Sequence, residues 1–419
     1  MKSSIVIGAN YGDEGKGLIT DYLAYTNRSR SVVRFNGGAQ AGHTVVLPDG
    51  TRHVFGHFSS GTFAHADTYY GSKCIVNPLL LFREATNFRS KTNFDLPDLN
   101  IDRDAIVTTP YDMLINQMQS FSSKMTCGAG INETVQRSTF RAQHHQGYDI
   151  FGDIFNIKFG EIQSAENLRY RLELIKRYWV PYRLHSLGLD KRMNEDLYRR
   201  LFDKKISETF IEQMMILVDN TRDVSVVEKL KTKTDDHIIF EGAQGLGLDE
   251  VNGHYPYVTR SRTGLNNALD ICKRIDVNEI DIYYVTRAYL TRHGDGPMES
   301  ELKTPPYKGI VENTNVYNQY QGDFRYGHID AKELQRRIQT DLRANMFMLD
   351  GIKVKVHLAV TCLDQINDDA FFKSGKKSKK IKTTRKTFAA DLAHFIGFDN
   401  YLESYGPTRD TIYTHMMVS

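Results

Sequence analysis

Catalytic chemistry is indicated first by a glycine-rich segment near the N-terminus, residues 8–17, which reads GANYGDEGKG. It follows the apolar run Ser4 to Gly8 and precedes Leu18 to Ala24, which can begin a helix. Glycines let an anion approach the main chain, and the dipole of a following helix favours negative charge. The pattern therefore predicts a phosphate-binding loop. It departs from the Walker A template, because Asn10 replaces the first glycine and Gly17 replaces the Ser or Thr after the lysine.

Two acidic residues inside this loop, Asp13 and Glu14, are unusual for a phosphate site. Their charges repel a phosphate unless a cation or a protonated ligand atom lies between them. Asp13 is therefore expected to hold Mg²⁺ or to act as a base. The alternative is an Asx-type turn closed by its carboxylate.

Two further loops of small and polar residues follow apolar runs. His43 lies in NGGAQAGHT, residues 36–44, and Gln244 lies in FEGAQG, residues 240–245. An isolated histidine is more often structural, but beside a phosphate site His43 can act as an acid, a base or a cation that stabilises phosphoryl charge. Gln244 offers both a donor and an acceptor to a ligand.

The elements that must position these loops are short, continuously apolar strands separated by segments of helical length. Such strands are typical of a sheet covered on both faces, so we expect an α/β fold. The expected architecture is P-loop-NTPase-like, with a large, mainly parallel central sheet and helices on both of its faces. In such sheets ligands collect at the carboxyl ends of the strands. The strands are expected at Ser4–Gly8, Ser31–Phe35, His237–Phe240, Ile282–Val285 and Val354–Val360.

The chain is expected to form a single domain over residues 1–419, with a helical insertion at about 161–235 and a peripheral C-terminal part at about 365–419. In the insertion, an amphipathic helix is predicted from Leu168 to Trp179 behind a cap at Ser164, and a second helical pattern spans Asn194 to Val218.

Composition excludes several classes of protein. The 419 residues are 40% hydrophobic and 25% charged, which are ordinary globular values, and no apolar run is long enough to span a bilayer. The net charge of +3 and four scattered cysteines favour a cytoplasmic protein of a reducing compartment, with no nucleic-acid partner. A lysine-rich stretch from Phe371 to Phe388 is more typical of a solvated loop or hairpin than of a phosphate-binding patch.

Several motifs in one order resemble the adenylosuccinate synthetase family, from about residue 4 to 415. They are Tyr11–Gly17, Gly37–Thr44, Phe240–Gly245, Gly253–Thr259, Ala288–Arg292 with Gly296–Pro297, and Gly406–Arg409. The resemblance implies a ligase that joins L-aspartate to C6 of IMP, with GTP and Mg²⁺, through a 6-phosphoryl intermediate. It implies four catalytic residues, which are Asp13, Lys16, His43 and Gln244.

The resemblance also implies ligand-binding residues, position by position. The phosphate donor would contact Gly12, Gly15, Gly17, Thr44, Asp364, Gly406 and Pro407. The purine monophosphate would contact Gln40, Thr126, Cys127, Arg141, Thr259 and His293. Aspartate would contact Gln321, Gly322 and Arg325, and the metal would contact Asp13 and Gly42. Arg141 matches an arginine that reaches across a dimer interface, which implies a homodimer.

Four positions depart from the family pattern on ligand-facing loops. Gln40 replaces asparagine, Cys127 replaces threonine, Asp323 replaces arginine and Cys362 replaces lysine. Other segments are similar to viral relatives, some of which act on dGMP or accept ATP; a viral protein would work in the host cytoplasm. IMP with GTP is the leading expectation, and dGMP, with ATP as an alternative donor, stays open. A non-catalytic nucleotide-binding protein and a nucleic-acid-associated module are the remaining alternatives.

Overall fold

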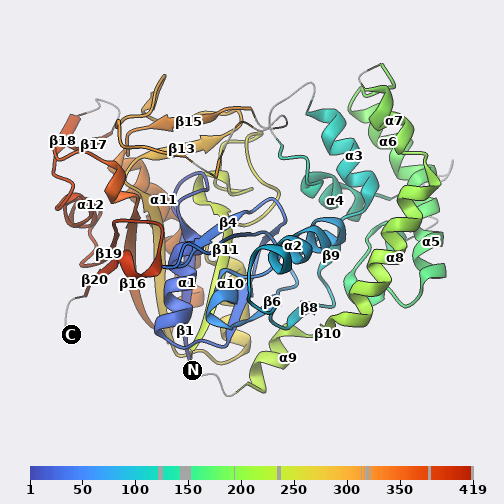
Figure 1. Ribbon diagram of the computed structural model, residues 1–419, viewed down its shortest axis with the longest axis horizontal. Helices are drawn as coiled ribbons and strands as arrows, with labels where there is room; N and C mark the ends of the chain where they lie inside the picture. The colour runs from blue at the N-terminus through green and yellow to red at the C-terminus, as the bar shows by residue number, and fades with distance from the viewer. Residues whose placement is uncertain are drawn as a thin grey trace.

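The computed structural model describes residues 1–120, 126–141, 152–192, 194–233, 237–312, 314–315, 317, 320, 322–375 and 379–416. Its centre is one ten-stranded sheet (Figure 1). Every neighbouring pair in it is parallel except the last, β19 with β20. In spatial order the strands are β10 (Arg222–Val224), β8 (Leu99–Asp102), β6 (Asp67–Tyr70), β2 (Ser31–Arg34), β11 (His237–Gly245), β1 (Lys2–Gly8), β12 (Glu279–Arg287), β16 (Lys353–Thr361), β19 (Asn400–Ser404) and β20 (Ile412–His415).

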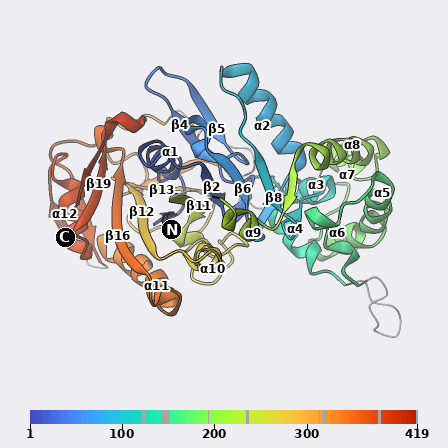
Figure 2. The ribbon, with the colours of Figure 1, turned by 90° about the horizontal axis from the view of Figure 1, so that it is seen from below.

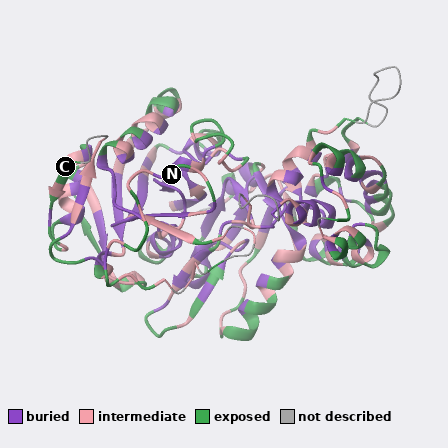
Figure 3. Ribbon diagram, turned by 90° about the horizontal axis from the view of Figure 1, so that it is seen from above, coloured by how far each residue is buried: buried purple, intermediate pink, exposed green. Residues whose placement is uncertain are grey.

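All five strands expected from the sequence are present, and together they form the contiguous centre of the sheet, β2-β11-β1-β12-β16. Their continuous apolar character has the expected cause, because both faces are buried (Figure 3). The predicted α/β fold with a mainly parallel central sheet is confirmed.

Helices cover the two faces of the sheet (Figure 2). On one face, α1 (Lys16–Thr26) packs Leu18 and Leu23 against Val6 and its neighbours. On the other face, Ile5 and Ile7 belong to a larger core, to which α9 (Val226–Lys231) and three further helices contribute residues. These are α10 (Asn266–Arg274), α11 (Ala331–Leu349) and α12 (Phe388–Ile396).

A second hydrophobic core lies on the β10–β8 side of the sheet and is formed mostly by helices (Figure 1). They are α3 (Pro110–Gln119), α5 (Ala165–Leu174), α6 (Val180–Ser186), α7 (Glu195–Arg200) and α8 (Lys204–Asn220), with α2 (Pro78–Lys91) and α4 (Ile131–Ser138) beside them. Ser164 caps α5 as predicted, and a π-helical turn, Ile175–Trp179, joins α5 to α6.

The second predicted helix of this region is wrong in one respect. The pattern from Asn194 to Val218 forms two helices, α7 and α8, because the Asp203 carboxylate accepts a hydrogen bond from the Lys205 backbone N–H and starts a new helix. The region predicted as a helical insertion, residues 161–235, also contains β10 and α9 (Val226–Lys231). The division into one domain, a helical insertion and a peripheral C-terminal part stays a prediction.

Short strands outside the main sheet complete the described fold. They are β3 (Gly37–Gly38), β4 (His43–Val46), β5 (Arg52–Phe55), β7 (Cys74–Val76), β9 (Ile106–Val107), β13 (Leu290–His293), β14 (Glu301–Leu302), β15 (Phe324–Gly327), β17 (Phe371–Ser374) and β18 (Lys379–Lys382). The antiparallel pair β17–β18 shows that the lysine-rich stretch forms a hairpin, of which residues 376–378 lie outside the described part. Among the described residues, no helix has both the length and the apolar character needed to traverse a bilayer. All four cysteines are free thiols.

One buried ion pair fastens α4 to the rest of the helical core. The Arg137 and Asp112 side chains are fully buried, and Arg137 Nε lies 3.0 Å from both carboxylate oxygens. The Arg137 guanidinium also donates to the Val107 carbonyl at 2.6 Å and to the Phe155 carbonyl. We expect Arg137→Met to reduce the free energy of unfolding by about 3–5 kcal/mol, because it leaves a buried carboxylate without its cation.

Denaturant unfolding followed by circular dichroism measures this change. Arg199→Met is the matched control, since the Arg199 side chain is 80% exposed and its loss should change the free energy of unfolding by less than about 0.5 kcal/mol. Equal effects of the two substitutions would contradict the structural role of Arg137.

Candidate active site

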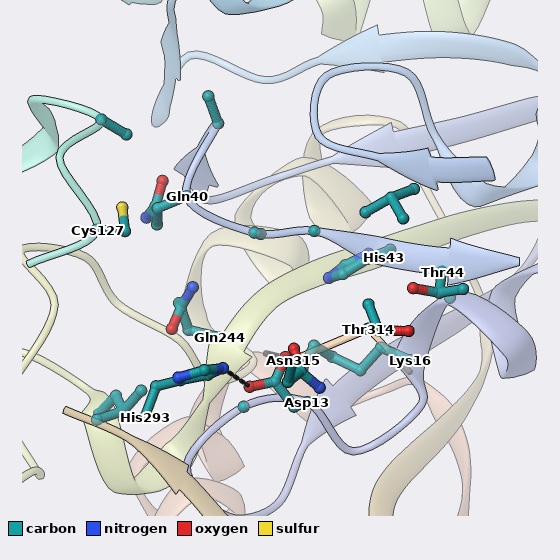
Figure 4. Close-up of a pocket in the computed structure, with 18 of the residues that line it drawn as sticks. Asp13, Lys16, Gln40, His43, Thr44, Cys127, Gln244, His293, Thr314 and Asn315 are labelled. Carbon is teal, nitrogen blue, oxygen red and sulfur yellow. Dashed lines mark ion pairs between the residues drawn. The ribbon is translucent and has the colours of Figure 1, made fainter. Parts of the chain in front are cut away.

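A cavity of about 590 Å³ opens at the carboxyl edge of the central strands (Figure 4). The loops after β1, β2 and β11 contribute to its wall, together with the end of β12. Twelve of the residues expected from the sequence line it, which are Gly12, Asp13, Gly15, Lys16, Gly17, Gln40, Gly42, His43, Thr44, Cys127, Gln244 and His293. Loops more than 200 residues apart in the chain therefore meet at one site.

The loop after β1 is held in shape by Glu14. One oxygen of its buried carboxylate accepts hydrogen bonds from the backbone N–H groups of Asn10 at 3.1 Å and Gly12 at 2.7 Å. The other oxygen accepts from Lys16 Nζ at 2.6 Å. Gly15 begins α1 with a left-handed φ of 94°, a conformation that favours glycine. Glu14 is thus neutralised within the loop and does not confront a ligand as a free charge.

Tyr11 fastens the same loop to α11. Arg337 donates to Asn10 Oδ1 and to the Tyr11 hydroxyl, both at 2.9 Å, and the Tyr11 hydroxyl donates to Glu299. The guanidinium groups of Arg292 and Arg337 lie 4.6 and 4.7 Å from the centre of the Tyr11 ring. Since Arg292 precedes His293, these contacts connect the loop to the segment that carries His293.

Asp13 differs from Glu14 because no described residue donates a hydrogen bond to its carboxylate. Its Oδ2 lies 4.0 Å from His293 Nε2 (Figure 4). Its backbone carbonyl accepts a hydrogen bond from Arg287 Nε at 2.5 Å. Burial raises the pKa of Asp13 above its ordinary value, although His293, Arg287 and Lys16 act in the opposite direction. A carboxylate with a raised pKa is a stronger base, which suits it to accept a proton from a ligand.

His43 forms a buried pair with Glu241. His43 Nδ1 lies 2.5 Å from Glu241 Oε1, and Ser60 donates to the same carboxylate from both its N–H and its hydroxyl. Burial alone would raise the pKa of Glu241, but His43 and Arg34 lower it to about 2, so this carboxylate is ionised. An ionised carboxylate only accepts hydrogen bonds, so Nδ1 carries a proton. His43 Nε2 has no partner among the described residues and is left for a ligand.

Polar groups without partners also occur on the loop of Gln40. Both amide atoms of Gln40 are buried and lack a hydrogen-bond partner among the described residues, which indicates a ligand-binding role. Cys127 lines the cavity, whereas the Thr126 hydroxyl is used internally and donates to Asn116 Oδ1 at 2.6 Å. Thr126 therefore holds its loop on α3 and does not line the cavity.

The residues expected to contact the donor base lie at the same edge of the sheet but outside the cavity wall. Asp364 follows β16, and Gly406 and Pro407 follow β19, the neighbouring strand. Thr361, at the end of β16, donates from its hydroxyl to the Glu14 carbonyl at 2.7 Å. This contact joins the β16 end to the phosphate loop.

Other expected ligand residues are also outside the cavity wall. Arg325 pairs with Glu301, with Nε 2.7 Å from Oε1, and also donates to the carbonyls of Gly294 and Gly296. Arg141 pairs with Asp153 and lines a second cavity of about 600 Å³ beside Trp179 and Tyr182. Thr259 and Gly322 are also absent from the wall of the first cavity, and Gln321 lies outside the described residues.

Three residues of the site were not predicted from the sequence. They are Arg83, Glu241 and Arg287. Glu241 stands inside a motif that was singled out, but the motif carries no sign of a pairing with His43, which is 198 residues away in the chain. Arg287 ends β12, where strand ends carry ligand groups. Arg83 has no sequence signal, because it is one arginine on an ordinary amphipathic helix.

The oxygen atoms at the cavity suit a magnesium ion. Asp13 and Gly42, the two expected ligands, both line the wall. Within the described residues no cluster of three His, Cys, Asp or Glu side chains could hold a metal. Mg²⁺ does not need one, since it keeps several waters and is usually bound through one or two carboxylates and the phosphates of a substrate. The Asp13 carboxylate, which accepts no hydrogen bond from a described residue, fits that ion.

A strand, a glycine-rich loop and a helix N-terminus beside a polar cavity define a phosphate-binding α/β protein. The adenylosuccinate synthetase family model matches residues 5–388, so the chain belongs to this family, whose members are enzymes of the C–N ligase type. A relative from Microcystis aeruginosa is 33% identical over 72% of this chain and 63% of its own length. One from Mesoplasma florum is 28% identical over 96% of this chain and 88% of its own length. Both are named adenylosuccinate synthetase.

Two solved structures share the fold. Fully ligated adenylosuccinate synthetase from Plasmodium falciparum matches with a TM-score of 0.71 and 19% identity, over 99% of each chain. The succinoaminodeoxyadenylate synthetase PurZ of cyanophage S-2L, solved with dGMP and with dATP as an energy donor, matches with a TM-score of 0.58 and 16% identity. That match covers 99% of this chain and 96% of the phage protein.

The pairing of His43 with Glu241 can be tested by titration. Burial lowers the pKa of His43 while Glu241 raises it. We expect Glu241→Gln to lower the pKa of His43 further, so that its imidazole stays neutral to lower pH, as measured by NMR of the labelled ring. Glu212→Gln, on the exposed face of α8, is the control and should leave His43 unchanged. A His43 pKa that rises or stays constant in Glu241→Gln would contradict the pairing.

Proposed function

We propose that this protein joins L-aspartate to C6 of a purine nucleoside monophosphate, with a nucleoside triphosphate as phosphate donor. The leading pair of substrates is IMP and GTP, which would give adenylosuccinate. The observation that carries the proposal is the meeting of Asp13, Lys16, His43 and Gln244 at one cavity beside the phosphate loop. Membership of the family supports the same reaction.

The first step would form a 6-phosphoryl nucleotide. Asp13 takes the proton from N1 of the purine, the electrons move to O6, and O6 attacks the terminal phosphorus of the donor. The bond from that phosphorus to the bridging oxygen breaks, and the nucleoside diphosphate leaves. Lys16 and the loop N–H groups stabilise the transferring phosphoryl group, and His43 Nε2, once protonated, donates to the leaving phosphate oxygens.

The second step would replace the phosphate by aspartate. The amine of aspartate attacks C6, the bond from C6 to O6 breaks, and inorganic phosphate leaves with the proton that the amine loses. Gln244 would hydrogen-bond to the purine edge throughout. Arg325 would bind a carboxylate of aspartate through its planar fork, which requires exchange of its present partner, Glu301.

A magnesium ion fits the proposal. Asp13 and the Gly42 carbonyl would hold it together with donor phosphates. When bound, it would neutralise charge that develops on the phosphate oxygens.

The donor and the assembly complete the proposal. Asp364 would accept hydrogen bonds from the guanine edge of GTP, with Gly406 and Pro407 beside the base.

The protein would work in the cytoplasm as a homodimer, in which the partner's Arg141 reaches the nucleotide phosphate. The location of Arg141 outside the cavity of its own chain supports this role.

A second candidate reaction uses dGMP, with ATP as a possible donor. It is favoured by Gln40 and Cys127, which depart from the family pattern and line the cavity. It is also supported by the fold shared with the phage synthetase that was solved with dGMP and dATP.

A substrate matrix tests both candidates. The purified protein, Mg²⁺ and aspartate are incubated with IMP, GMP, dGMP or dIMP against GTP or ATP, and products are identified by mass. We expect a succinyl-purine product, most with IMP and GTP. The variant Asp13→Asn should lose at least about 10²-fold in turnover, because it removes the general base. No product with any combination would refute the ligase, and product from dGMP alone would establish the second candidate.

A further inference from the structure

One positive charge of the cavity has no counter-charge in the described structure. Among the lysine and arginine side chains of the wall, Lys16 pairs with Glu14 at 2.6 Å and Arg287 pairs with Glu312 at 2.9 Å. Arg83, the third, makes no ion pair or hydrogen bond with any residue that the structure describes. An exposed guanidinium at a cavity wall is ready to bind an anionic ligand.

The position of Arg83 at the cavity wall depends on its helix, α2. Asn77 caps α2 by accepting a hydrogen bond from the Leu80 N–H. Leu80 and Arg83 are one turn apart on the same face, and both line the cavity. Glu84, the next residue, is buried and accepts from the backbone N–H groups of His57 at 2.6 Å and Phe58 at 3.1 Å. The contacts of Glu84 set the rotation of α2, and in this position of the helix Arg83 lies at the cavity wall.

The residues around Arg83 suit the sugar-phosphate part of a nucleotide. The wall that it shares includes Gln117 and Cys127, together with Gln40, whose amide lacks a partner among the described residues. In a purine nucleoside monophosphate, the 5′-phosphate lies at the opposite end of the molecule from C6. If C6 lies at Asp13, the 5′-phosphate points away from the glycine-rich loop and needs a separate cation.

We propose that Arg83 binds the 5′-phosphate of the purine monophosphate and does so within its own chain. This inference rests on the proposed function, because that function places C6 at Asp13. It adds a contact from the same subunit to the one expected from the partner's Arg141. The planar guanidinium forms two parallel hydrogen bonds with phosphate oxygens, a geometry that lysine does not reproduce.

Isothermal titration calorimetry measures the affinity of the protein for each monophosphate and for the matching nucleoside. The pairs are IMP with inosine and dGMP with deoxyguanosine. Arg83→Gln should weaken the binding of the preferred monophosphate by about 10–100-fold, as expected for a lost charge-assisted hydrogen bond. It should change the affinity for the matching nucleoside by less than about twofold. Arg83→Lys should restore part of the affinity. Arg89→Gln, an exposed arginine of the same helix outside the cavity wall, is the matched control and should bind like the unaltered protein.

The outcomes separate this inference from the proposed function, because binding needs no turnover. A selective loss of monophosphate affinity in Arg83→Gln supports the phosphate contact even if no succinyl product forms. Normal turnover together with unchanged monophosphate affinity in Arg83→Gln would overturn the contact and leave the proposed function standing. An equal loss for monophosphate and nucleoside, or no monophosphate binding by the unaltered protein, would also overturn it.

Discussion

The alignment of five parallel strands is the constraint on which the site depends. Because β2, β11, β1, β12 and β16 run in one direction, their carboxyl ends meet at a single edge. Each of these ends delivers a different chemical group, from the phosphate loop after β1 to the imidazole beyond β2 and the amide at the end of β11. Helices on both faces bury the strands, so the edge is one of the few places where the sheet can meet a ligand.

Charge within the cavity is distributed so that one carboxylate stays reactive. Glu14 accepts two backbone N–H groups and Lys16, and Glu241 accepts from His43 and Ser60. These hydrogen bonds hold both carboxylates in fixed positions within the fold. Asp13 has no such donors among the described residues, and burial raises its pKa. The structure thus separates two structural acids from one that can exchange a proton or hold a cation.

The sequence predicted the central strands and the glycine-rich loops of the cavity wall, because both leave local patterns. Continuous β-branched runs mark buried parallel strands, and loops of glycine and small polar residues mark the strand ends. Contacts between distant residues leave no such pattern. The pairing of Glu241 with His43, the contact of Thr361 with the Glu14 carbonyl and the unpaired charge of Arg83 all depend on tertiary packing. The break between α7 and α8 was missed because the apolar spacing continues across the capping residue Asp203.

The central claim is that O6 of the purine, and not water, attacks the phosphate donor. A heavy oxygen isotope placed at the C6 carbonyl of the accepted monophosphate tests this claim most directly. If Asp13 and the loop activate O6 as described, the label must leave with inorganic phosphate, because the bond from C6 to O6 breaks only after phosphorylation. Mass spectrometry of the released phosphate should therefore find one labelled oxygen per succinyl product. Label in water, with unlabelled phosphate, would contradict the account.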